Sequence, residues 1–144
     1  MKTNSILRAL LLAASLSAAA GLAVARSTTM VELGRQTYMT TDAKPIGVDA
    51  VRKAILAGGA VHGWKPVADV PGVLTLEADS GQHQVVVDVA YDAQGWLITY
   101  KSSANMNYEH SDKKSSIHPK YNKWVEDLNG EIRRAATNAP AQSN

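Results

Sequence analysis

The sequence predicts an α+β fold, a two-layer sandwich in which an antiparallel sheet of three to four strands carries two helices on one face. Two amphipathic stretches of helical period, residues 48–61 and 119–136, enclose a series of short runs of period two. A helix with one apolar stripe and a sheet with one apolar face are stable when each buries that surface against the other. The expected order is an N-terminal arm, a helix, the strands, a loop and a second helix.

The first helix is predicted over residues 48–61. Its apolar positions recur at helical spacing and are Val48, Val51, Ala54, Ile55 and Val61. Gly58 and Gly59 weaken the end of this helix, and Gly63 is a natural stop. Residues 26–47, which precede it, have no sustained periodicity and predict a partly ordered arm with the option of adding an edge strand.

Strands are predicted over residues 64–70, 73–78, 83–91 and 96–101. The turn 92–95 joins the last two strands into a hairpin, with Gly95 at the position expected to need a positive φ. Both helices should pack on the sheet face that carries Val85, Val87, Val89, Trp96, Ile98 and Tyr100.

Residues 102–116 are polar and predict one long loop, which is either functional or mobile. Pro119 suits the first position of the last helix. The apolar stripe of that helix is Tyr121, Trp124, Val125, Leu128 and Ile132. A single domain over 48–136 is therefore expected, followed by a disordered tail over 137–144.

The first 25 residues have the three parts of a cleavable export signal. Lys2 and Arg8 supply a positive start, an apolar run follows, and Ala23-Val24-Ala25 gives the small-x-small cleavage pattern. The run is shorter than the roughly 20 strongly apolar residues of a membrane span. The chain has no cysteine, which is the residue that carries the lipid of a lipoprotein. We therefore expect cleavage after Ala25 and a mature chain free in the periplasm, with no transmembrane span.

Cleavage also changes the charge. The whole chain has 15 basic and 13 acidic residues. Loss of Lys2 and Arg8 leaves 13 of each sign, which is a net charge of zero. A neutral domain gives no case for binding nucleic acid. The absence of cysteine removes disulfides and thiol chemistry.

Four segments of the sequence occur together, namely Gly63-Trp64 after the first helix, the strand end 98–103, Asn105-Met106-Asn107-Tyr108 and the segment 117–124, which opens with Ile117-His118. In these segments the chain resembles a family of small exported, lipoprotein-like proteins of Gram-negative bacteria. The shared pattern is Tyr-Lys-x-Ser, then Asn-Leu/Met-x-Tyr, then Ile-His-x-x-Tyr-Asn-x-Trp. The resemblance spans about 48–132 and implies the compartment and the architecture. It brings no established activity.

Any function is expected in the segment 102–122. Its neutral hydrogen-bonding side chains are Ser102, Ser103, Asn105, Asn107, Tyr108, His118, Tyr121 and Asn122. These residues either line a site for a small polar ligand or an envelope protein, or they fix the backbone of the loop. His118 likewise either caps the last helix or serves as the base of a small hydrolase-like enzyme.

The leading hypothesis is a non-enzymatic binding or envelope-accessory module, with strand addition at a sheet edge as a further alternative. No metal is expected at His110, Asp112 and His118, because the intervening lysines would repel a cation. No cofactor is expected, since no glycine-rich phosphate loop is present. Catalytic residues stay unassigned.

Overall fold

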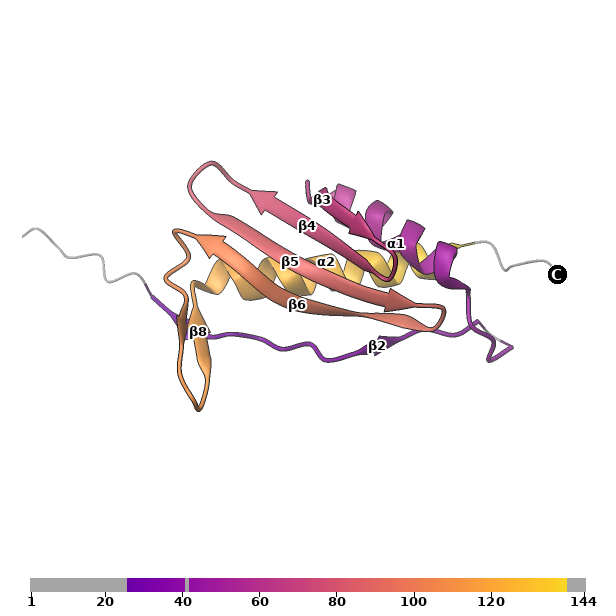
Figure 1. Cartoon of the computed structure of the whole chain (residues 1–144), viewed down its shortest axis with the longest axis horizontal. Helices are drawn as coiled ribbons and strands as arrows, with labels where there is room; N and C mark the ends of the chain where they lie inside the picture. The colour runs from indigo at the N-terminus through magenta and orange to yellow at the C-terminus, as the bar shows by residue number, and fades with distance from the viewer. Residues whose placement is uncertain (1–25, 41, 140–144) are drawn as a thin grey trace, which may run out of the picture.

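The computed structural model describes residues 26–40 and 42–139, so the predicted leader and residues 140–144 of the predicted tail lie outside it. Figure 1 shows one large sheet with both helices behind it and the N-terminal arm running along one edge. In chain order the elements are β1 (Thr28–Thr29), β2 (Gln36–Thr37), α1 (Val48–Val61), β3 (Lys65–Val70), β4 (Val73–Asp79), β5 (Gln84–Asp92), β6 (Gly95–Ala104), β7 (Glu109–His110), β8 (Ser115–Ile117) and α2 (Pro119–Thr137).

The main sheet is antiparallel and has the order β2-β6-β5-β4-β3. Val85, Val87 and Val89 are fully buried, whereas the β5 residues between them are half-buried, so the strand alternates as predicted. Trp96 and Ile98 belong to the same buried core as the apolar stripes of the helices. The predicted two-layer α+β sandwich is confirmed. The fifth strand is β2, which the arm contributes, and β1, β8 and β7 form a second, small antiparallel sheet.

Residues 102–116 do not form the single long loop that their composition predicts. β6 continues through Ser102 and Ser103 to Ala104, and β7 and β8 then pair with each other. β8 also pairs with β1 of the arm, with Thr28 opposite Ile117. The loop prediction was wrong because strands of two or three residues show no apolar alternation, and the residues of β7 and β8 within 102–116 are all polar and at least partly exposed.

The predicted stop of α1 is confirmed, but its glycines have a different role from the one expected. Gly63 follows the helix with a φ of 75°, and the N–H of Trp64 bonds back to the carbonyl of Gly59 at 3.0 Å. Gly58 and Gly59 are buried within the helix. A Cβ placed on Gly58 would lie 2.5 Å from the backbone nitrogen of Ile132 in α2. Gly58 therefore permits the close approach of the two helices.

Gly95 is also required for a reason that the sequence did not suggest. Asp92 Oδ1 accepts hydrogen bonds from the N–H groups of Gln94 at 2.8 Å and Gly95 at 3.2 Å, which closes the predicted hairpin. Gly95 is not among the glycines with positive φ, so that prediction was wrong. A Cβ at Gly95 would overlap the carbonyl oxygen of Gln36 in β2. The glycine makes room for the backbone of the arm.

The last helix begins at Pro119 as predicted and runs one residue past the expected end of the domain. Its buried residues are Tyr121, Val125, Leu128, Ile132 and Ala136. Trp124 is only half-buried, at the margin of this stripe. Within the described part of the chain, neither helix has the length and apolar character needed to cross a membrane.

Candidate functional site

A groove of about 470 Å³ lies between the N-terminal arm and β6. Arm residues 30–34 form one wall and β6 residues 97–100 form the other. Tyr108, His110, Ser115 and Tyr121 complete the lining. Figure 1 shows the arm passing beside β6 on its way from the small sheet to β2. The groove thus brings part of the predicted 102–122 segment against the N-terminal arm.

β6 presents an unpaired edge along this groove. The arm pairs with β6 only through β2, with Gln36 opposite Trp96 and Thr37 opposite Gly95. From Leu97 to Tyr100, no strand of the described chain pairs with the side of β6 that faces the arm. The N–H and C=O groups of a strand point alternately to its two sides. Some of these groups in β6 therefore face the groove, where the backbone of a ligand can reach them.

Three tyrosines form the aromatic end of the groove. The ring of Tyr100 stacks on Tyr108 with their centroids 4.2 Å apart and meets Tyr121 edge-on at 5.8 Å. The hydroxyls of Tyr100 and Ser103 share a hydrogen bond of 3.0 Å. Burial, with smaller effects of Tyr100 and Tyr108, raises the pKa of Tyr121 well above its usual value. Tyr108 is 37% exposed and is the tyrosine most accessible to a bound partner.

Asn122 fixes the wall of the groove that the arm provides. Its Oδ1 accepts a hydrogen bond of 2.9 Å from the backbone N–H of Val31. Its Nδ2 donates one of 2.9 Å to the carbonyl oxygen of Thr29. The side-chain amide therefore bonds to the arm as a neighbouring strand would, and its role in the site is indirect.

Asn105 and Asn107 shape the turn that follows β6. Both have a positive φ, 56° and 48° respectively, a conformation that asparagine tolerates better than most residues. Between them Met106 is buried in the core with 1% of its surface exposed. Asn105 Nδ2 also donates to the carbonyl oxygen of Gln82 at 2.9 Å. The structural interpretation of this asparagine pair is therefore favoured over a role in contacting a ligand.

His118 is the N-cap of α2. Its Nδ1 accepts a hydrogen bond of 3.1 Å from the backbone N–H of Lys120. Its ring lies 4.9 Å from that of His83, measured between centroids. Among the hydrogen bonds of the described residues, none joins His118 to a hydroxyl group, which a histidine base in a hydrolase-like site would need. The geometry therefore favours the cap over the base.

Acid is expected to destabilise the protein through His118. Protonation removes the acceptor at Nδ1 and adds a positive charge at a helix N-terminus, beside His83 and Lys120. Burial, followed by His83 and Lys120, lowers the pKa of His118 from its usual 6.5 in the folded protein. The folded state then binds fewer protons than the unfolded state, so stability falls as the pH drops below 6.5.

The measurement is the melting temperature between about pH 7 and pH 5, the range in which histidine titrates. The matched control is His118→Asn, because asparagine caps a helix without titrating. The melting temperature of this variant should fall less over the same range. An equal fall in both proteins would assign the acid sensitivity to other groups.

Comparison with known protein families, curated proteins and solved structures finds no match to this chain. The function is therefore inferred from geometry. In the part of the chain that the structure describes, no group of three or more His, Cys, Asp or Glu side chains is arranged to hold a metal ion.

Only two of the eight residues predicted to form the site line the groove. Tyr108 and Tyr121 line the groove, while Ser103 supports it through Tyr100. Residues of the predicted set that do not line it are Ser102, Ser103, Asn105, Asn107, His118 and Asn122. The sequence reasoning missed Tyr100 and the arm residues 30–34 as parts of the site. In the sequence, Tyr100 follows Ile98 by two residues and so falls on the same sheet face. This pattern predicted a core residue and gave no indication of the groove.

Proposed function

We propose that this chain is an exported, non-enzymatic binding protein of the Gram-negative envelope, which holds an extended segment of a partner protein in the groove beside β6. The unpaired edge of β6 between Leu97 and Tyr100 is the observation that carries the proposal. An extended peptide that pairs with a free sheet edge gains affinity from backbone hydrogen bonds. Its side chains then meet the surfaces on either side of the edge.

The β6 wall of the groove suits such a segment, and the carboxylate among the lining residues, Glu32, lies on the opposite wall formed by the arm. Leu97, Ile98, Thr99 and Tyr100 carry no charge, so an approaching strand desolvates no ion at the edge. Tyr108 offers an exposed aromatic ring beside it, and aromatic residues contribute strongly to binding interfaces. The partner segment is therefore expected to be uncharged where it pairs and to place an apolar side chain against Tyr108.

The opposite edge of the sheet is a poorer site for strand addition. β3 carries Lys65 and Pro66, and its register shifts between Pro66 and Ala68. Charged side chains, proline and bulges are the features by which edge strands avoid pairing with other chains. These features favour the β6 groove over β3.

Export to the periplasm is part of the proposal. It is supported by the positive, apolar and small-residue parts of the first 25 residues and by the resemblance to small exported proteins of Gram-negative bacteria. Cleavage after Ala25 would leave the arm, which forms one wall of the groove, as the N-terminal segment of the mature chain. N-terminal sequencing of the periplasmic protein should start at Arg26, whereas retention of the leader in the membrane fraction would overturn this assignment.

The binding proposal is tested by photocrosslinking in intact cells, with a photoreactive amino acid at Thr99, an exposed position of the groove wall. A discrete crosslinked envelope protein is expected. Tyr108→Ala should reduce its yield about tenfold, as the loss of an interface aromatic residue does. The same substitution should lower stability by only about 0.5–1.5 kcal/mol, the contribution of one aromatic pair.

The matched control is Val67→Ala, which alters an exposed apolar residue of β3. It should leave the crosslink unchanged. Loss of the crosslink with Val67→Ala and not with Tyr108→Ala would place the partner on the other edge and refute the proposal. Absence of any crosslink from Thr99 would refute it as well.

A further inference from the structure

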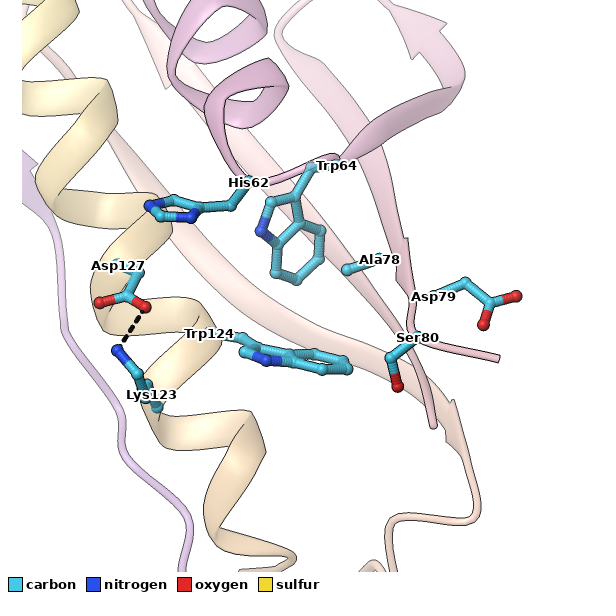
Figure 2. A pocket seen from close by; sticks show the side chains of 8 residues that line it. All are labelled: His62, Trp64, Ala78, Asp79, Ser80, Lys123, Trp124 and Asp127. Carbon is cyan, nitrogen blue, oxygen red and sulfur yellow. Dashed lines mark hydrogen bonds and ion pairs between the residues drawn. The ribbon is translucent and has the colours of Figure 1, made fainter. Parts of the chain in front are cut away.

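A second pocket, separate from the groove, lies where the end of α1, the end of β4 and the first half of α2 meet (Figure 2). Its volume is about 230 Å³. Figure 2 shows Trp64 reaching from the end of α1 toward the ring of Trp124, which projects from α2. His62 and the Lys123–Asp127 pair lie on one side of these rings, and Ser80 lies on the other. No residue lines both this pocket and the groove.

The indole of Trp64 carries a hydrogen-bond donor that the described chain does not use. Only 4% of the surface of this residue is exposed, so the side chain is almost wholly removed from water. Trp96, also buried, donates its Nε1–H to Asn129 at 2.8 Å, but no described residue accepts from Nε1 of Trp64. Figure 2 shows this nitrogen on the side of the ring that faces His62. Among the described residues, His83 Nδ1 is the side-chain nitrogen that is fully buried without a partner, so Nε1 of Trp64 is open to the pocket, where its N–H is free to donate to a ligand that carries an acceptor.

The pocket is polar but has no dominant charge. Lys123 Nζ bonds Asp127 at 2.8 Å, so these two charges compensate each other. Asp79 accepts a hydrogen bond of 2.6 Å from the N–H of Gly81, and Figure 2 shows its carboxylate pointing away from the pocket. A cation would meet the indole N–H and the ammonium, and an anion would meet Asp127. A neutral ligand avoids both.

We propose that this pocket binds one pyranose ring of a saccharide. A pyranose presents an apolar C–H face that can lie against the half-buried indole of Trp124. Its hydroxyl groups both donate and accept, so they can accept from Trp64 Nε1–H and donate to Asp127 or Ser80. The volume lies below the range of pockets for drug-sized ligands, which limits the site to about one ring.

The test is a titration of the ¹⁵N-labelled exported protein with methyl α-glucoside, observed through the three indole N–H signals in NMR spectra. Trp64→Phe and Trp124→Phe assign the signals, since each removes one. The signals of Trp64 and Trp124 should move and saturate at about millimolar sugar, an affinity reasonable for so small a ligand. The signal of Trp96 should stay in place, because its N–H is bonded inside the core.

Trp64→Phe keeps an aromatic ring without the donor and should weaken binding about tenfold, as judged from the Trp124 signal. Tyr108→Ala, which changes only the groove, should leave sugar binding intact, so this proposal and the peptide-binding proposal can fail separately. A tetrasaccharide of the same sugar that binds more tightly than the monosaccharide would identify a polysaccharide as the source of the ring, and equal affinity would identify a free sugar.

Two results would overturn the proposal. The first is the absence of any movement of the Trp64 and Trp124 signals at about 100 mM methyl α-glucoside, far above a millimolar Kd. The second is movement of these signals with tetramethylammonium chloride or sodium acetate and not with the sugar, which would make the pocket an ion site.

Discussion

Gly58→Ala is expected to destabilise the protein by about 3 kcal/mol, the upper part of the range for adding one methyl group to a packed interior. The added Cβ would come 2.5 Å from the nitrogen of Ile132, which is part of the α2 backbone and cannot turn aside as a side chain can. The helices must therefore move apart. Urea denaturation measures the change as a lower midpoint with a similar slope.

Gly130→Ala is the matched control for this substitution. Gly130 is exposed in α2, and a Cβ there meets no atom within 4 Å. Alanine has the higher helix propensity, so this variant should be more stable by about 1 kcal/mol. A stability loss for Gly58→Ala together with a stability gain for Gly130→Ala would establish that close packing against α2 causes the loss at Gly58. A stabilised Gly58→Ala protein would contradict the helix contact described above.

Trp96→Ala is expected to cost about 3–5 kcal/mol, the usual range for removing a large buried aromatic side chain. Trp96 has no exposed surface, and its ring lies 5.6 Å from the guanidinium carbon of Arg133. Its removal leaves a cavity at the junction of β6 and α2, and it leaves Asn129 Oδ1 without its hydrogen bond. Thermal and urea unfolding of the variant measure the loss.

Trp124→Ala provides the comparison, because Trp124 is half-buried at the margin of the core. It should cost about half as much, since less apolar surface returns to water and no cavity forms inside. A loss for Trp96→Ala that is as small as the one expected for Trp124→Ala would show that Trp96 is less well packed than its burial indicates.

The sequence predicted α1 and α2 closely, because strong local signals mark their ends. Gly63 has the positive φ that ends α1, and Pro119 occupies the first position of α2. The main strands were also recognisable, since Val85, Val87 and Val89 repeat with the period of a strand that is buried on one face. In these cases the residues that determine the element lie within it or next to it.

The candidate site was only partly predictable, because it depends on contacts between distant segments. Tyr108 and Tyr121 were identified, but the arm that faces them has no periodic pattern of its own. Its position depends on pairing with β8 and β6 and on Asn122, which bonds to Thr29 and Val31. An asparagine that bonds to a distant backbone looks, in the sequence, the same as one that fixes its own loop.

The attachment of the arm to Asn122 also determines when the groove can form during folding. Thr29 and Val31 lie near the start of the described chain, and their partner Asn122 lies in the last helix. Contacts between segments so far apart in sequence form late and slowly, because a long loop must close first. A nascent or truncated chain that lacks α2 can still pair the arm with β6 and β8, but it lacks the Asn122 amide that bonds Thr29 and Val31. The stretch of the arm that faces β6 across the groove is therefore fully attached only after α2 has been synthesised.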